Sequence, residues 1–203
     1  MDSNGYLDAL ANGFGRELNY VLQGPDCIYH AILHAWKEVD PDEAASHDVC
    51  SLRRLVVSTL SDDHYLERPW ATSIDGGAIT LRTTLANLAQ EKGLSLPQWL
   101  TTLSNSDLHG DEEGAVLGFC IATKSAAHVI TPSGVRALSA PVCAGAQLQP
   151  RHGIWLAMDP GRYCASTTSK YGSGTRLPSP NIFLACLCNC LPCTSFNYAP
   201  LRR

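Results

Sequence analysis

Apolar residues recur at helical spacing through most of the N-terminal part of the chain. This pattern predicts helices over residues 6–20, 41–60 and 78–92. Residues 111–125 are more uniformly apolar, which predicts a further helix but is also compatible with a strand. The polar segment at residues 61–77 predicts a loop.

One predicted helix begins directly after a turn-forming cluster. Residues 23–26 read QGPD, and residues 27–36 that follow them are apolar along one helical face. Asp26 is a residue type that caps helix N-termini. The pattern therefore places Cys27 in the first turn of a helix.

The pattern changes to short strands after these helices. Residues 128–131 predict a strand followed by a turn, and residues 153–158 predict a second strand. The tight turn at residues 159–161 and the segment at residues 162–165 predict a returning antiparallel strand. Helices followed by a small, mostly antiparallel sheet indicate an α+β fold.

Domain limits follow from composition. A chain of 203 residues fits one domain, and we expect that domain to cover residues 1–165. Residues 166–203 are expected to be separate from it, with a connector at 166–180 rich in Ser, Thr, Gly and Pro. Residues 182–193 are apolar and rich in cysteine, and the pattern assigns them no structure.

Charge and cysteine content narrow the classes of protein. The net charge of −4 provides no basic surface for nucleic acid, so we expect no nucleic-acid partner. The number of cysteines is odd, nine, and the chain is not short, which favours a reducing compartment over a disulfide framework. The sequence shows neither a signal-peptide pattern nor a run long enough to span a membrane. We expect a cytoplasmic protein, in the host cytoplasm if it is viral.

The predicted position of Cys27 suits a nucleophile. The first turn of a helix offers unpaired N–H groups and the positive end of the helix dipole, and both stabilise a thiolate. The same N–H groups can donate to a developing oxyanion during acyl transfer. The alternative is a buried structural cysteine, because free cysteine is among the most buried residue types.

The neighbourhood of Cys27 resembles a known family. Residues 24–32 read GPDCIYHAI, which is similar to the nucleophile motif of the ovarian-tumour (OTU) cysteine proteases. Gly24 and Pro25 depart from the Asp-Gly that opens that motif. The resemblance implies a papain-like OTU fold with Cys27 as nucleophile, and with Asp26 helping to set the turn and the helix start.

A second resemblance lies near the end of the predicted domain. Residues 154–164 look like the closing hairpin of the OTU family, in which a strand and turn precede His-Tyr-Asn/Asp. In that register Arg162 stands at the histidine position and Cys164 at the position of its orienting partner. An arginine stays protonated and is no general base. Three accounts remain open: a binding pseudoprotease, a variant of an active enzyme, or an enzyme with a base from elsewhere.

Two histidines are candidates for a base from elsewhere in the chain. His128 and His152 both lie downstream of Cys27 and near the start of predicted strands. A histidine beside an apolar strand is also a common structural residue, so position alone does not assign the base.

No metal or other cofactor is expected. His30 and His34 have an i, i+4 spacing that can bind a metal, but no glutamate follows in the pattern of a zinc protease. His47, His64 and His109 lie in polar surroundings. Zinc binding, lipidation and a plain apolar strand remain alternatives for a tail cluster of four residues: Cys186, Cys188, Cys190 and Cys193.

Two functions from different classes follow. The first is an OTU-type cysteine protease, of a kind more similar to viral than to cellular members, which acts on ubiquitin or a ubiquitin-like modifier or on a polyprotein cleavage site. The second is a catalytically impaired pseudoprotease that binds ubiquitin or another partner, for which Arg162 is the direct sequence evidence.

Overall fold

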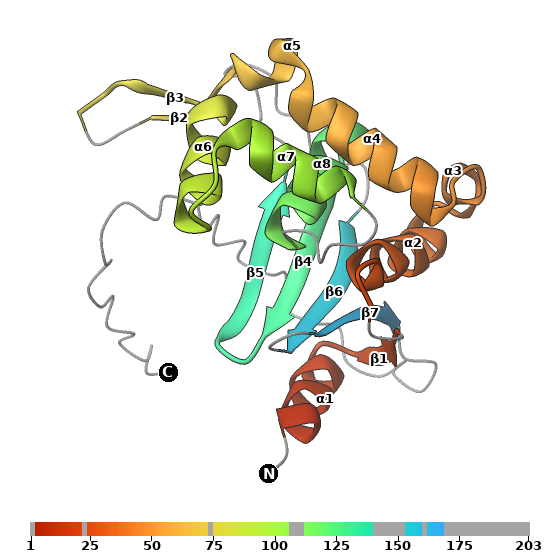
Figure 1. The fold of residues 1–203 in the computed structure, drawn as a ribbon. Coiled ribbons are helices and arrows are strands. Elements are labelled where there is room, and N and C mark those ends of the chain that lie inside the picture. The colour runs from red at the N-terminus through yellow and green to blue at the C-terminus, as the bar shows by residue number, and fades with distance from the viewer. Residues whose placement is uncertain are drawn as a thin grey trace.

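Helices pack against a mixed sheet in this protein (Figure 1). The computed structural model describes residues 3–21, 24–72, 75–105, 112–139, 153–159 and 162–168. The helices of this part are α1 (Ser3–Gly13), α2 (Cys27–Val39), α3 (Pro41–Ala45), α4 (Val49–Ser61), α5 (Asp63–Leu66), α6 (Leu81–Glu91), α7 (Leu96–Ser104) and α8 (Glu112–Thr123). The strands are β1 (Arg16–Tyr20), β2 (Pro69–Thr72), β3 (Ala78–Thr80), β4 (Ala126–Thr131), β5 (Gly134–Ser139), β6 (Gly153–Asp159) and β7 (Arg162–Thr168).

The main sheet combines the first strand of the chain with the last described ones. Within the described ranges its strand order is β1-β7-β6-β4-β5. Strands β4 and β6 pair in parallel, and the other neighbours pair antiparallel. Strands β2 and β3 form a separate ribbon, which projects at the upper left in Figure 1. The prediction of an α+β fold with a mostly antiparallel sheet is confirmed.

The two faces of the main sheet are covered by different helices. The larger core joins α2, α4 and α8 to one face, where Val129 of β4 and Leu156 of β6 are buried. Helix α1 covers the other face, where Leu7 and Ala11 pack with Ile130 and Ala157. Since side chains alternate between faces along a strand, these clusters fix which strand positions face α2 and which face α1.

The expected helix over residues 6–20 is partly wrong. Helix α1 ends at Gly13, and the chain then turns into β1, which pairs with β7. Gly15 has a φ of +67°, a left-handed conformation that favours glycine and turns the chain here. The apolar positions of residues 16–20 therefore belong to an edge strand of the main sheet.

The expected helix over residues 41–60 is two helices, α3 and α4. Asp48 interrupts it, because its carboxylate accepts from the Ser51 N–H (2.7 Å) while the Ser51 hydroxyl accepts from the Asp48 N–H (2.8 Å). This reciprocal capping starts α4 anew. The expected loop at 61–77 contains α5 and β2, and α7 had no counterpart among the predicted elements.

The remaining predicted elements are present in the structure. Helices α2, α6 and α8 and strands β4, β6 and β7 lie where the sequence pattern placed them, with β3 taking the first residues of the 78–92 segment. The proposed domain limit at residue 165 falls inside β7, which continues to Thr168. The first three residues of the expected connector, 166–168, therefore belong to β7, and the rest of the connector and the cysteine-rich tail lie outside the described residues. Among those described, no helix is long and apolar enough to cross a membrane.

Candidate functional site

Cys27 is the first residue of α2. Its N–H donates to the Gly24 carbonyl (3.1 Å), and the His30 N–H donates to the Asp26 carbonyl (3.0 Å), which closes the first helical turn. Cys27 is a free thiol and only 6% exposed. Helix α2 packs against β6 and β7, so the thiol lies at the end of a helix that rests on the sheet.

Asp26 occupies the N-cap position but does not cap α2. Its φ and ψ of −99° and 5° are not those of a usual N-cap residue, and its side chain accepts no hydrogen bond from the helix amides. The carboxylate instead forms an ion pair with Arg53. The expected capping role of Asp26 is therefore wrong, although its position at the helix start is confirmed.

Arg53 is a buried cation that the sequence reading missed. It belongs to α4 and is 5% exposed. One guanidinium nitrogen bonds Asp26, and the other donates to the carbonyls of Leu103 (2.8 Å) and Asn105 (3.0 Å) at the end of α7. The guanidinium carbon also lies 4.5 Å from the centre of the Tyr29 ring. Arg53 thus joins the start of α2 to the end of α7.

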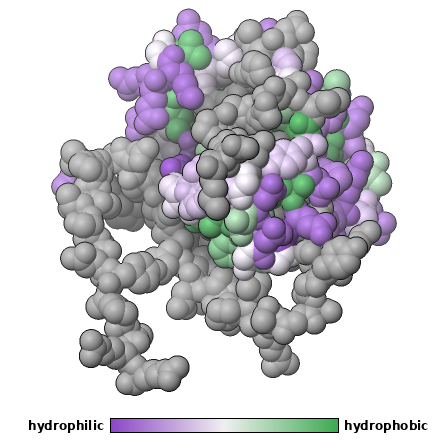
Figure 2. Space-filling view, turned by 90° about the horizontal axis from the view of Figure 1, so that it is seen from below, coloured by the Kyte–Doolittle hydropathy of each residue, from purple (hydrophilic) through white to green (hydrophobic). Residues whose placement is uncertain are grey.

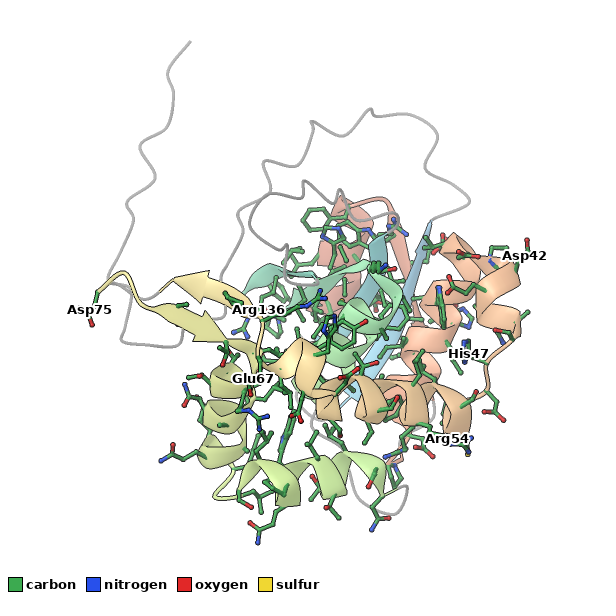
Figure 3. All side chains as sticks on the ribbon, turned by 90° about the horizontal axis from the view of Figure 1, so that it is seen from above. Asp42, His47, Arg54, Glu67, Asp75 and Arg136 are labelled. Carbon is green, nitrogen blue, oxygen red and sulfur yellow. The ribbon has the colours of Figure 1, made fainter. Side chains whose placement is uncertain are left out.

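A sequence signal for Arg53 does exist. Arg53, Val56 and Leu60 follow a spacing of i, i+3 and i+7, so the arginine lies on the apolar face of α4. The neighbouring Arg54 lies on the exposed face of the same helix and is labelled in Figure 3. A charged residue on an apolar stripe needs a partner, because burying an unpaired charge is costly.

Arg162 is the first residue of β7. It pairs with Asp159 across the β6–β7 hairpin, and two positions later Cys164 pairs with Ala157 on one side and Tyr20 on the other. Strand β7 contacts α2, so the backbone that carries Arg162 belongs to the strand beside the Cys27 helix. The predicted antiparallel hairpin between these strands is present.

His128 lies on the face of the sheet that α1 covers. Its ring stacks on Trp155 of the neighbouring strand with 4.5 Å between centroids, and Trp155 packs with the cluster under α1. Arg16 lies over the same Trp155 ring at 4.9 Å. Burial, and to a lesser extent the charge of Arg16, lower the pKa of His128. Since α2 packs on the opposite face, this structure does not bring His128 to Cys27.

The other candidate residues are not gathered around Cys27. His30 and His34 are exposed on α2, and the ring of His47 stacks on Trp36 rather than lying in the polar surroundings we expected. His64 contacts Arg68 and Tyr65. His152, His109 and the four tail cysteines lie outside the described residues. Within the part that the structure describes, no group of three or more His, Cys, Asp or Glu side chains could hold a metal ion.

The fold as a whole is similar to those of known structures. The OTU domain of OTUD1 matches with a TM-score of 0.52 and 15% identity over 81% of this chain and 94% of that one. An OTU deubiquitinase from Wolbachia pipientis wMel matches with a TM-score of 0.50 and 8% identity over 76% of this chain and 90% of that one. No family model matches the sequence, and no curated protein matches it significantly. The chain therefore has an OTU-like fold, which these two matches show through structure alone.

Proposed function

We propose that this protein is a cysteine peptidase of the OTU type that acts on ubiquitin or a ubiquitin-like modifier, with Cys27 as its nucleophile. The observation that carries the proposal is the position of Cys27, at the N-terminus of a helix that rests on the sheet of an OTU-like fold. The Wolbachia match is itself a deubiquitinase by name. We place the activity in the cytoplasm.

The chemistry begins with the Cys27 thiolate. Its sulfur forms a bond to the carbonyl carbon of the substrate amide, and the C–N bond then breaks to leave a thioester and an amine that takes up a proton. Water hydrolyses the thioester, which yields the carboxylic acid and returns the thiol. Amide N–H groups at the start of α2 are suited to stabilise the carbonyl oxygen while it carries negative charge.

The residues that we considered for proton transfer fit that role poorly in the structure. Arg162 is protonated and cannot take a proton from the thiol, while His128 lies on the α1 face of the sheet. This favours a second candidate function, a pseudoprotease that binds ubiquitin or a partner without cutting it. Retention of the residues around Cys27 supports the enzyme.

Replacement of Arg162 separates these candidates. The native protein, Cys27→Ala and Arg162→His would be assayed for hydrolysis of ubiquitin that carries a fluorogenic amide at its C-terminus. We expect Arg162→His to raise the rate about a hundredfold or more, because positioned acid–base catalysis contributes on that order. Arg136→His, which changes an exposed arginine on β5 labelled in Figure 3, is the control and is expected to change nothing.

The outcomes lead to different functions. Hydrolysis that disappears in Cys27→Ala supports the peptidase. If the native protein binds ubiquitin but neither arginine variant hydrolyses the substrate, the result supports the pseudoprotease. If neither binding nor hydrolysis of ubiquitin is seen, ubiquitin is the wrong substrate, and a polyprotein cleavage site, as in a viral-type member, is the substrate to test next.

A further inference from the structure

Asp26 is placed where a carboxylate would interfere with a neighbouring thiolate. An aspartate at the N-cap normally accepts a hydrogen bond from the second or third helical N–H, and the second helical N–H here is that of Ile28. In that position the carboxylate would occupy an amide that can stabilise an anion at the start of α2, and it would add a negative charge beside Cys27. The Asp26 side chain makes no such bond.

Arg53 explains why the Asp26 carboxylate does not cap α2. Its guanidinium holds the Asp26 carboxylate in an ion pair and is itself fixed by the carbonyls of Leu103 and Asn105 and by the Tyr29 ring. An arginine that is 5% exposed with these partners has little freedom to move. The Arg53–Asp26 pair is therefore held in place by α4 and the end of α7 rather than by α2 alone.

We propose that Arg53 is a positioning residue for the Cys27 reaction: it holds the Asp26 carboxylate away from the Ile28 N–H at the start of α2, which leaves that group for the Cys27 thiolate or the substrate oxyanion. The inference rests on the proposed function for its role in catalysis. Arg53 also offsets the charge of Asp26. Among the described residues of α2 next to this turn, Tyr29 and His30 are the other titratable side chains.

The test is the pH dependence of alkylation at Cys27. The purified full chain would be treated with iodoacetamide from pH 5 to 10, and the rate would be read by mass spectrometry on the peptide that contains Cys27, which separates it from the other thiols. In Arg53→Met the released carboxylate can cap α2. We expect the midpoint of the profile to move up by about one pH unit, and the rate below the midpoint to fall about tenfold.

A second substitution distinguishes positioning from a merely structural role. Alanine does not cap a helix, so adding Asp26→Ala to Arg53→Met is expected to return the midpoint to the native value. A double variant that keeps the raised midpoint would overturn the proposal, as would an Arg53→Met profile that matches the native one. Arg54→Met changes the exposed neighbour on the same helix and is expected to leave the midpoint unchanged.

The proposal stays testable if Arg53→Met does not fold, since loss of a buried cation is costly. Asp26→Ala alone keeps the Arg53 contacts to Leu103 and Asn105. We expect its midpoint to equal the native one or lie below it, and a higher midpoint would show that Asp26 itself supports the thiolate. This assay uses no ubiquitin, so failure of the ubiquitin assays overturns the proposed substrate without touching the role of Arg53.

Discussion

The charges around Cys27 come from residues on two different helices. Asp26 precedes Cys27 in the chain, while Arg53 reaches Asp26 from α4 and forms a partly buried ion pair with it. The dipole of α2 then remains as a source of positive potential at the thiol. The proposed reactivity of Cys27 therefore rests on Arg53 as well as on the residues next to it in sequence.

His128 makes a prediction about stability at the residue scale. Its pKa in the folded state is lowered from 6.5 by burial and by Arg16, so the unfolded chain binds more protons as the pH falls through 6.5. Folding stability from this residue is therefore present above that pH and is lost below it. His128→Phe keeps an aromatic ring on Trp155. When the pH is lowered from 7 to 5, we expect its free energy of unfolding to decrease by less than that of the native protein.

Urea unfolding at the two pH values measures this difference. His34→Gln is the control, because His34 is exposed on α2 and its replacement is expected to leave the native pH dependence unchanged. An equal loss of stability in the native protein and His128→Phe would contradict the assignment of this pH dependence to His128.

The residue-scale features could be predicted only where they are local in sequence. The position of Cys27 follows from a turn and an apolar helical face that adjoin each other. The partners of Arg53 are not local: Asp26 and the Leu103 and Asn105 carbonyls come from elements that only the folded chain brings together. The face of the sheet on which His128 lies likewise depends on strand pairing.

Close packing between helices is the main feature at the element scale. Helix α8 packs against α4 and α7, and its Gly118 leaves no room for a larger residue, since a Cβ atom there would lie 2.6 Å from Cγ1 of Val56. A Cβ atom at Gly114, one turn earlier, would lie 2.5 Å from Cζ2 of Trp99. These glycines allow α8 to approach its neighbours closely.

Gly118→Ala is therefore expected to destabilise the protein. Adding a methyl group to a filled core costs about 1–3 kcal/mol. Replacing glycine by alanine in a helix gains about 1 kcal/mol. The cost exceeds the gain when overpacking lies in the upper part of its range. Val56→Ala removes the atom that the new methyl group would meet, so the double variant is expected to recover part of the loss. Thermal unfolding followed by circular dichroism measures both.

Gly5→Ala is the matched control, because Gly5 also lies in a helix and no atom lies within 4 Å of its Cβ position. It is expected to leave stability unchanged or to raise it slightly. A Gly118→Ala protein as stable as the native one would contradict the close packing of α8 on α4.

Element boundaries were less predictable than element types. Hydrophobic periodicity continued through residues 41–60, but the pair of hydrogen bonds between Asp48 and Ser51 ends one helix and starts the next. Residues 16–20 joined the helical stripe before them because a short edge strand carries little pattern of its own. Helix α7 is short and was not predicted, although Ser95 and Gln98 form a capping box and a proline stands at its second position, both of which are helix-start signals.

The strand order shows which segments of the chain the main sheet needs in order to form. Strand β7 lies between β1 and β6, so the last described strand joins the N-terminal strand to the rest of the sheet. Figure 1 shows β1 and β7 side by side at the end of the sheet near α1. The face seen from below in Figure 2 is mixed, with small separate apolar areas among polar ones over the described residues there.

A truncation series tests this arrangement. A chain that ends at residue 168 is expected to unfold cooperatively, while one that ends at residue 164 is expected not to, because it loses the buried Ala165 and most of the β1–β7 pairing. Urea unfolding followed by tryptophan fluorescence measures the difference. Equal cooperativity in both chains would show that residues 165–168 are not needed for the fold.

The fold and the position of Cys27 at the start of a helix could be predicted together, because both follow from local patterns and from the resemblance of residues 24–32 and 154–164. The proton-transfer residue could not, since it depends on which side chains meet across the sheet. The central claim is that Cys27 attacks the C-terminal carbonyl of ubiquitin or a related modifier. A ubiquitin with a thiol-reactive electrophile at its C-terminus tests this without requiring turnover.

The measurement is the formation of a covalent adduct between that ubiquitin and the purified full chain. We expect one adduct, which disappears in Cys27→Ala and persists in Cys50→Ala, because Cys50 is an exposed free thiol outside the site. An adduct that forms equally with Cys27→Ala, or an absence of any adduct with both the native protein and Arg162→His, would contradict the account.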